Sequence, residues 1–260
     1  MISVREQAEI NKKAWEYRAY EFWNQRNGSP RAYADSIKKD PMARLDLHQE
    51  YFRDVRGLKI ANPCGSNGRK AVPLALLGAE VTVFDISEEN RNYALELAQE
   101  AKVEIEYVLG DFCDVDLNQY GQCFDMVYAE GGIISYFNDI NQFTETLYAI
   151  TKLGGKLILN DFHPFGKISP LGSSMMDASQ MTGGDYFDVQ LHYGSVAYQP
   201  FFPQEEQDLF PQCLLRTYTM SEIINAVISS GFTLQELLEH PTYDDSKLPG
   251  LFTIIAERRD

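Results

Sequence analysis

The residues with the clearest chemical pattern are a run of small side chains, Cys64-Gly65-Ser66-Asn67-Gly68, and an acid, Asp85, that follows Gly65 by 20 residues. Small residues after an apolar stretch let backbone N–H groups approach a ligand closely. An acid at the end of the next apolar stretch can accept hydrogen bonds from two ribose hydroxyls. Because nucleotide-binding units place these features roughly 20 residues apart, the pattern indicates a site for an adenosine-type ligand.

Such a site needs alternating strands and helices to position it. The apolar runs predict strands at about 58–62, 80–84, 103–108, 124–129, 156–161, 232–238 and 251–257. Helices are expected between most of them, at about 69–77, 87–97 and 139–152 and after the capping box that begins at Thr219. Strands separated by helices pair in parallel through right-handed crossovers. The short link before the seventh strand favours an antiparallel pair. The predicted fold class is therefore α/β, with a seven-stranded, mostly parallel sheet.

Two segments lie outside that alternation. Residues 4–25 predict one aromatic-rich helix, and a second helix is expected over about 40–55, with Asp40 as N-cap. Residues 164–217 are rich in aromatic residues, and their alternation near 188–193 predicts short antiparallel strands. Their three methionines, Met175, Met176 and Met181, suggest an apolar pocket, although methionine also fills ordinary cores.

The predicted domain organisation has four parts. Residues 1–57 form an N-terminal helical lid, residues 58–163 form the binding core, residues 164–217 are an inserted cap, and residues 218–260 complete the core. A chain of 260 residues suits one large α/β domain with an insertion.

Composition narrows the function classes. The net charge of −15 repels phosphate backbones, which disfavours a nucleic-acid substrate. The four cysteines contain no CxxC pair and predict reduced thiols rather than a disulfide framework or metal site. We expect a cytoplasmic monomer or homodimer, without a signal peptide or membrane span.

With these motifs in order, the sequence resembles the class I S-adenosylmethionine-dependent methyltransferases, in particular their small-molecule branch. The resemblance covers residues 58–163 best and 217–258 less closely. It implies a Rossmann-like fold, S-adenosylmethionine as cofactor with S-adenosylhomocysteine as product, and a small-molecule methyl acceptor.

The family's glycine-rich motif falls on Asn62, Cys64, Gly65, Ser66 and Gly68. The resemblance implies that these residues bind the cofactor. The chain departs from the family here, because Asn62 stands where an acid is usual and Cys64 and Ser66 stand where glycines are usual. Losing the acid removes one anchor near the amino-acid end of the cofactor.

The family's adenosine contacts fall on residues after the second and third strands. Asp85 matches the ribose-binding acid, with Ile86 beside the adenine, although an Asp in this position can also cap the helix that begins near Ser87. Asp111 and Phe112 match the residues that hold the adenine amino group and ring. The structural alternative for this second pair is a turn aspartate and a core phenylalanine.

The remaining candidates are Glu130 and Gly131 near the methionine end of the cofactor, Tyr20 in the lid and His163 as general base. An imidazole has a pKa suited to proton removal near neutral pH, and His163 follows a predicted strand. Each candidate also has a structural alternative: a plain loop, a core tyrosine and a histidine that closes the strand. A base is needed only for a protonated acceptor.

Two other functions share part of this pattern. An NAD(P)-dependent dehydrogenase has the same strand, turn and acid but requires G-x-G-x-x-G, which is missing here. A non-catalytic protein that binds S-adenosylmethionine fits the altered residues at positions 62, 64 and 66. The sequence favours the methyltransferase.

Overall fold

The computed structural model describes residues 2–167, 185–242 and 247–260. Met175, Met176 and Met181, which suggested an apolar pocket, lie outside these residues.

The main sheet has seven strands in the order β3-β2-β1-β4-β5-β9-β8 among the described residues. Its strands are β1 (Lys59–Pro63), β2 (Glu80–Asp85), β3 (Glu106–Leu109), β4 (Phe124–Glu130), β5 (Thr151–Phe162), β8 (Phe232–Pro241) and β9 (Pro249–Arg258).

The pairing confirms the predicted fold class. Strand β1 pairs in parallel with β2 and β4, and β2 pairs in parallel with β3. The last strand, β9, is antiparallel to both β5 and β8. Almost all of β1 and β2 is buried, as expected for parallel strands covered on both faces. A second sheet of β6 (Leu191–Gly194) and β7 (Cys213–Arg216) confirms the short antiparallel strands expected near 188–193.

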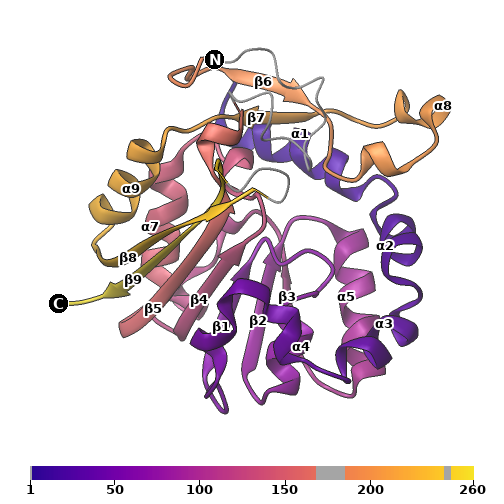
Figure 1. Cartoon of the computed structure of the whole chain (residues 1–260), viewed down its shortest axis with the longest axis horizontal. Coiled ribbons are helices and arrows are strands. Elements are labelled where there is room, and N and C mark those ends of the chain that lie inside the picture. The colour runs from indigo at the N-terminus through magenta and orange to yellow at the C-terminus, as the bar shows by residue number, and fades with distance from the viewer. Residues whose placement is uncertain (1, 168–184, 243–246) are drawn as a thin grey trace. The chain divides into compact units, whose positions relative to one another are not determined.

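Helices follow most strands of the main sheet (Figure 1). The α-helices of the described residues are α1 (Val4–Glu16), α2 (Ala19–Asn27), α3 (Pro30–Ile37), α4 (Ala71–Leu76), α5 (Glu88–Ala101), α6 (Leu117–Tyr120), α7 (Ile140–Ile150), α8 (Gln204–Gln207) and α9 (Met220–Ser229). Short 3-10 helices are η1 (Met42–Phe52), η2 (Phe112–Asp114), η3 (Ile134–Tyr136), η4 (Pro164–Lys167) and η6 (Gln199–Phe201).

The N-terminal prediction of two continuous helices is wrong. Arg18 has φ 59°, which ends α1 and begins α2. The prediction also missed α3, which Ser29 caps and Pro30 begins. The segment expected as a helix over 40–55 is instead the 3-10 helix η1, interrupted at Asp46 (φ 50°). Lys70 holds the interruption in place, because its Nζ donates to the Asp46 carboxylate at 2.6 Å.

Two strand boundaries also differ from the prediction. Strand β3 begins at Glu106 rather than near residue 103, because the Val103 N–H donates to the Ala98 carbonyl and closes the end of α5. Strand β5 begins directly after α7 and runs through two glycines that were expected to precede it. At Gly155 a Cβ would lie 3.1 Å from the Phe124 carbonyl oxygen, so the strand needs a residue without a side chain there.

The chain divides into two compact units, and each is described by itself. One unit comprises residues 15–129 and 149–155, and the other comprises 1–14, 130–148 and 156–260. In the first, called the turn unit, α2 and α3 pack on α5 (Figure 1). Their shared core includes Ala34 and Ile37 from α3, Val72 from α4, and Tyr93 and Leu97 from α5.

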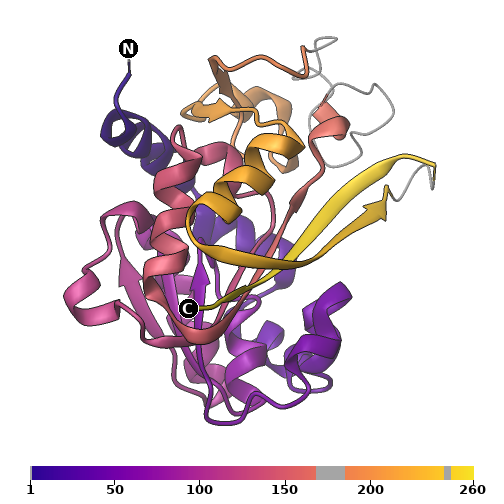
Figure 2. The same ribbon diagram turned by 90° about the vertical axis from the view of Figure 1, so that its left-hand side faces the viewer.

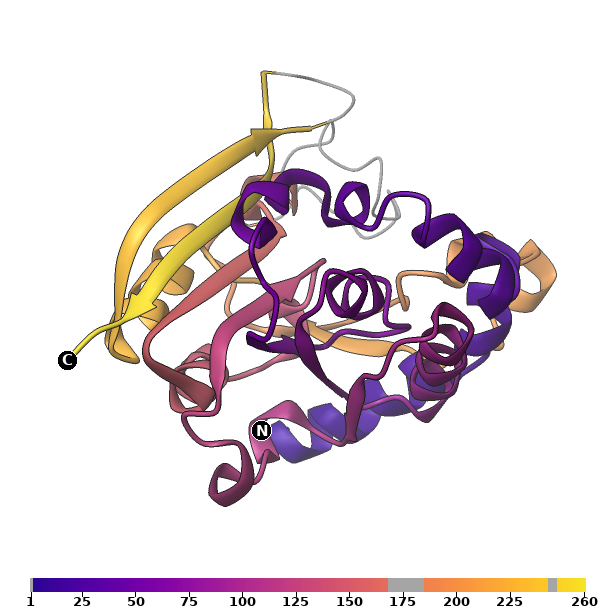
Figure 3. The ribbon, with the colours of Figure 1, turned by 90° about the horizontal axis from the view of Figure 1, so that it is seen from below.

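In the second unit, called the hairpin unit, β8 and β9 form a long antiparallel pair. Figure 2 shows these two strands side by side, in gold and yellow, and Figure 3 shows the same pair from below. Helix α9 begins with the predicted capping box, in which Thr219 and Glu222 satisfy each other's backbone N–H. It is tied to α7 by the Thr144 hydroxyl, which donates to the Ala226 carbonyl at 3.1 Å.

Candidate cofactor-binding site

The turn after β1 adopts a left-handed backbone at three positions. Cys64, Ser66 and Gly68 have φ of 51°, 50° and 76°. Glycine takes this conformation without strain, whereas a residue with a Cβ pays about 1–2 kcal/mol. The turn therefore keeps the glycine-type backbone at positions 64 and 66 although the sequence places side chains there.

Gly65 is required by close packing rather than by its φ. A Cβ at this position would lie 2.4 Å from Asn62 Oδ1, which leaves no room for any side chain. Asn62 is itself fixed, because its Nδ2 donates to the Tyr128 carbonyl of β4 at 2.8 Å. Its Oδ1 consequently faces the turn as an acceptor.

The same turn contains buried polar atoms that lack a hydrogen-bond partner. They are Asn62 Oδ1, Ser66 Oγ and both side-chain amide atoms of Asn67. Asn67 is fully buried. A buried polar group without a partner costs about 1–3 kcal/mol, and folded proteins normally satisfy such groups with protein atoms, water or a ligand. Uncharged donors and acceptors grouped on one turn therefore fit a polar ligand.

Asp85 lies at the end of β2, next to this turn, and is 8% exposed. Its Oδ2 accepts the Ser66 N–H at 2.9 Å, and its Oδ1 accepts the Ser87 N–H at 3.0 Å. Burial raises the pKa of this carboxyl group, and the backbone N–H groups of Ser87 and Ser66 oppose the rise. Asp85 therefore holds the turn and the start of α5, which matches the structural alternative. A carboxylate can accept about four hydrogen bonds, so these contacts leave room for ribose hydroxyls, and the ribose contact stays a prediction.

Tyr107 is a residue of this site that the sequence did not reveal. Its hydroxyl donates to the Ser66 carbonyl at 2.9 Å and so fixes the other side of the turn. Burial raises the pKa of Tyr107 well above its usual range, and the nearby Asp85 raises it further. Tyr107 therefore stays neutral and acts as a donor. In the sequence, the place of Tyr107 in a predicted strand indicated that it is buried, but nothing indicated its contact with Ser66.

The predicted adenine contacts, Ile86, Asp111 and Phe112, each have a different structural environment. Ile86 follows Asp85 and is half-buried. Asp111 caps the short helix η2, since its Oδ1 accepts the Cys113 N–H at 3.0 Å. Phe112 is buried with its ring edge-on to Phe84, at 5.7 Å between centroids. These contacts match the structural alternative, and an adenine contact by either residue stays a prediction.

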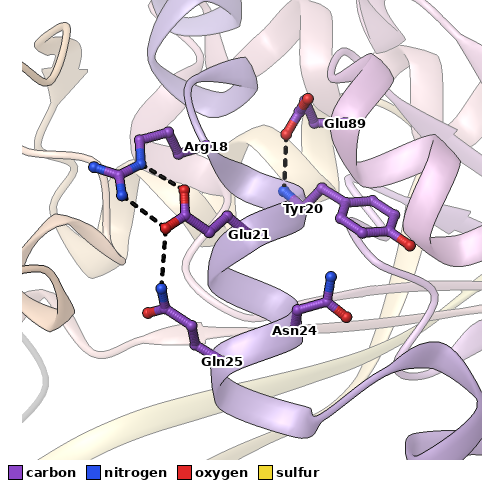
Figure 4. Close-up of a pocket in the computed structure, with 6 residues that line it drawn as sticks. All are labelled: Arg18, Tyr20, Glu21, Asn24, Gln25 and Glu89. Carbon is purple, nitrogen blue, oxygen red and sulfur yellow. Dashed lines mark hydrogen bonds and ion pairs between the residues drawn. The ribbon is translucent and has the colours of Figure 1, made fainter.

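Tyr20 lines a pocket of about 610 Å³ on α2, together with Arg18, Glu21, Asn24, Gln25 and Glu89 (Figure 4). Its backbone N–H donates to Glu89, and its hydroxyl donates to Glu96 at 2.6 Å. Partial burial and the Glu96 contact raise the pKa of Tyr20 to about 12. In Figure 4 Arg18 pairs with Glu21, which also accepts from Gln25. Tyr20 is thus bound to α5, and its contact with a cofactor stays a prediction.

Glu130, Gly131 and His163 belong to the hairpin unit. Gly131 and its neighbour Gly132 have φ of 99° and 83°, and a Cβ on Gly132 would lie 2.4 Å from the Phe162 ring. The Gly131 N–H donates to the Asn160 carbonyl at 3.2 Å. The loop that contains the predicted methionine-end residues is therefore closely packed on the end of β5.

His163 has partners on both ring nitrogens. Its Nδ1 accepts the Phe165 N–H at 3.1 Å, and its Nε2 lies 2.9 Å from the Glu239 carboxylate. Because Nδ1 is an acceptor, the proton of the neutral ring lies on Nε2 and points to Glu239. Burial lowers the pKa of His163, and Glu239 opposes the shift. Asp161, two residues before His163, accepts the Ile134 N–H at 2.8 Å.

The described residues contain no group of three or more metal-binding side chains suited to hold an ion. None of the described helices has the length and apolar character needed to cross a bilayer.

Comparisons with known proteins show what this chain is similar to. Residues 63–159 match the model of a family described as a methyltransferase domain. This part of the chain is therefore similar to a methyltransferase domain, and this match and the Rossmann-like sheet agree with the resemblance predicted from the sequence.

Individual relatives share the domain at low identity. An uncharacterized methyltransferase of Bacillus subtilis, YbaJ, is 27% identical over 128 residues, which cover 49% of this chain and 49% of that protein. The chain thus matches about half the length of this curated relative. A crystal structure of an S-adenosylmethionine-dependent methyltransferase from Mesorhizobium loti has a TM-score of 0.60 at 18% identity, covering 81% of this chain and 97% of that one.

A third similar structure is a magnesium protoporphyrin IX methyltransferase from Synechocystis with bound S-adenosylhomocysteine. Its TM-score is 0.60 at 17% identity, with 97% of this chain and 99% of that chain covered. At such identities the two structures establish the fold alone.

Proposed function

We propose that this protein is an S-adenosylmethionine-dependent methyltransferase that acts on a small-molecule acceptor and releases S-adenosylhomocysteine. The observation that carries the proposal is the turn after β1, which combines a glycine-type backbone with buried polar atoms that lack partners. This turn directly follows Pro63, the last residue of β1 and the residue where the match to the methyltransferase domain begins.

The residues of the turn unit fit the cofactor. Asn62 Oδ1 and the Asn67 amide supply uncharged acceptors and donors, and Gly65 keeps the approach to Asn62 open. Asp85 can accept the ribose hydroxyls while it retains the N–H groups of Ser66 and Ser87. The bound cofactor supplies an electrophilic methyl group on a sulfonium sulfur. What the protein must add is alignment of the acceptor and exclusion of water.

Two observations support a small-molecule acceptor: the net charge of the chain and the names of two similar structures. A net charge of −15 disfavours approach of nucleic acid. One similar structure is a magnesium protoporphyrin IX methyltransferase, and another concerns echinomycin biosynthesis. Both names refer to small molecules. The proposal assigns the N-terminal segment 1–57 and the insert 164–217 to covering the cofactor and the acceptor.

His163 remains the proposed general base for an acceptor that carries a proton. Both of its ring nitrogens are engaged, so this role requires that His163 release Phe165 or Glu239 when substrate binds. An acceptor that is already deprotonated, or a neutral amine, needs no such step. The proposal therefore favours acceptors that react without a protein base.

Calorimetric titration with S-adenosylmethionine, S-adenosylhomocysteine and NADH tests the proposal. We expect micromolar binding of both sulfur ligands, loss of that binding in Asp85→Ala, and no binding of NADH. Asp116→Ala is the matched control, because Asp116 caps α6 through the Asn118 N–H and lies on the exposed surface. Binding of NADH alone would establish a nucleotide site of the dehydrogenase type and overturn the proposal.

A non-catalytic protein that binds S-adenosylmethionine is the second candidate. The observations in its favour are the neutral Asn62, at the position where the family that the sequence resembles usually has an acid, and His163, whose two ring nitrogens both have partners. Incubation with S-adenosylmethionine and a small-molecule extract distinguishes the two. Formation of S-adenosylhomocysteine that depends on the extract supports the enzyme, and binding without turnover supports the second candidate.

A further inference from the structure

The first turn of α5, together with its N-cap, is bonded to the N-terminal segment 15–23 residue by residue. The Ser87 hydroxyl donates to the Trp15 carbonyl at 2.9 Å. The Glu88 N–H donates to the Glu16 carboxylate at 3.4 Å. These bonds satisfy polar groups at a helix N-terminus, where the first N–H groups have no partner within the helix.

The next two residues of α5 continue the same contact. Glu89 accepts the Tyr20 N–H at 3.0 Å, as Figure 4 shows. Asn90 accepts the Trp23 indole N–H at 2.8 Å through its Oδ1. Four consecutive residues, from the N-cap of α5 onward, therefore bind one segment of about nine residues that lies roughly 70 residues earlier in the chain.

The same turn holds Asp85. Besides the Ser87 N–H, the Asp85 Oδ1 receives the Asn90 Nδ2 at 3.4 Å. Asn90 is 1% exposed, so these contacts are sheltered from water. The indole of Trp23 can only donate, which places the Asn90 oxygen toward Trp23 and its amino group toward Asp85. One side chain thus bridges α2 and the acid of the candidate cofactor site.

We propose that Asn90 is a positioning residue for Asp85 and couples the docking of residues 15–27 to the binding of the nucleoside part of the cofactor. This inference rests on the proposed function, because it takes Asp85 as the ribose contact. When α2 is docked on α5, the Trp23 indole fixes the Asn90 side chain. Asn90 in turn fixes the Asp85 carboxylate in the orientation that accepts the ribose hydroxyls. Since such coupling is reciprocal, a bound nucleoside also favours the docked α2 by the same factor.

The chain contains its own reporter of this docking. Trp15 and Trp23 are its two tryptophans. In Trp15→Phe the backbone carbonyl that accepts from Ser87 is kept, and Trp23 becomes the single tryptophan. We expect S-adenosylhomocysteine to change the Trp23 fluorescence of this variant, and we expect Asn90→Ala to abolish that change.

The decisive experiment measures the Kd of S-adenosylhomocysteine by calorimetry in Trp23→Phe, in Asn90→Ala and in the double variant. Trp23→Phe removes one neutral hydrogen bond worth about 1 kcal/mol, so we expect its Kd to rise about fivefold. Asn90→Ala removes that bond and the bond to the Asp85 carboxylate, so we expect its Kd to rise at least as much. If Asn90 is the bridge, Trp23→Phe has no further effect in the Asn90→Ala background. Lys38→Met is the matched control, because Lys38 of the segment after α3 donates to the Glu100 carbonyl at 2.6 Å, far along α5 from Asp85. Its Kd should equal that of the wild type.

The outcomes separate this inference from the proposed function. A purely structural Asn90 would lower the melting temperature of the variants but leave the Kd and the Trp23 response to ligand unchanged, and this result would overturn the inference alone. Additive effects of the two changes would also overturn it. If the wild type does not bind S-adenosylhomocysteine, the proposed function and the inference both fail.

Discussion

Two regions of the molecule contain glycines at positive φ. One is the turn after β1, and the other is the loop after β4 together with the adjoining end of β5. The two regions differ in whether their buried polar groups have hydrogen-bond partners. In the turn, Asn62, Ser66 and Asn67 retain buried atoms without partners. In the loop region of the hairpin unit, by contrast, the polar side chains at the end of β5 have hydrogen-bond partners. Asp161 and His163 accept backbone N–H groups, and the amide of Asn160 donates to the Phe252 carbonyl at 2.7 Å.

This difference distinguishes a ligand-binding role from a structural one. Buried polar groups without partners destabilise a fold, so a protein that retains several on one turn gains something other than stability from them. Saturated groups contribute to the packing of the strand end. The comparison therefore supports the proposal that the turn recognises the cofactor, and it shows that the polar residues of the other region contribute to the structure there.

Gly65→Ala should have the largest effect on the turn. The new Cβ would displace the Asn62 side chain, which has no room to move because it is bonded to Tyr128. We expect a loss of about 1–3 kcal/mol in the free energy of unfolding, as for overpacked sites, and no detectable binding of S-adenosylhomocysteine. Urea denaturation and calorimetry measure the two quantities. Gly110→Ala is the control, because a Cβ there meets no atom within 4 Å. Normal ligand binding by Gly65→Ala would contradict the assignment.

A pair of asparagine substitutions compares the two regions directly. Asn67 and Asn160 are both buried, but only Asn160 has hydrogen-bond partners. Asn160→Leu should lower the free energy of unfolding by about 2 kcal/mol, because it removes the two buried hydrogen bonds that the Asn160 amide donates to the Phe252 carbonyl and the Thr253 hydroxyl. Asn67→Leu should leave stability equal or raise it by up to about 1 kcal/mol, and should weaken cofactor binding. Equal destabilisation by both changes would show that Asn67 has partners in the folded protein.

His163 predicts a pH dependence of stability. Its pKa is lowered in the folded protein by burial, so the unfolded chain binds the proton more readily. The contribution of His163 to the free energy of unfolding is therefore fully present above its ordinary pKa of about 6.5. It is lost as the pH falls through that value toward the lower pKa of the folded protein. The slope is at most about 1.4 kcal/mol per pH unit. Denaturation between pH 7.5 and 5 should show a smaller decline in His163→Gln than in the wild type. The exposed His192→Gln serves as control.

The smallest expected effect concerns backbone strain in the turn. Ser66→Gly and Cys64→Gly each place glycine at a positive φ and should raise the free energy of unfolding by about 1 kcal/mol. Ser66→Ala separates strain from the unpaired hydroxyl, because it keeps the Cβ and removes only Oγ. If Ser66→Ala stabilises as much as Ser66→Gly, the hydroxyl rather than the backbone is the source of the cost.

Local patterns predicted the fold well where neighbours in sequence control the structure. The capping box at Thr219, the strand ending in Asp85 and the antiparallel final strand all follow from residue types at short range. The break at Arg18 and the interruption at Asp46 did not, since each is a non-glycine residue held at positive φ. The Asp46 contact comes from Lys70, 24 residues away, and no local signal announces it.

The sequence by itself determined the strand–turn–helix–strand unit and the acid at its edge, and it predicted the class of ligand that the proposed function assigns to them. Hydrophobic periodicity and residue size are properties of neighbouring residues in the sequence, and they are the same in any fold that buries these strands. Only the tertiary structure decided which polar atoms of the turn lack partners, that both nitrogens of His163 are engaged, and that Asn90 joins Trp23 to Asp85. Those facts depend on hydrogen bonds between residues as many as 67 or 76 positions apart, such as Trp23 with Asn90 and His163 with Glu239, and such pairs are formed only when the chain has folded.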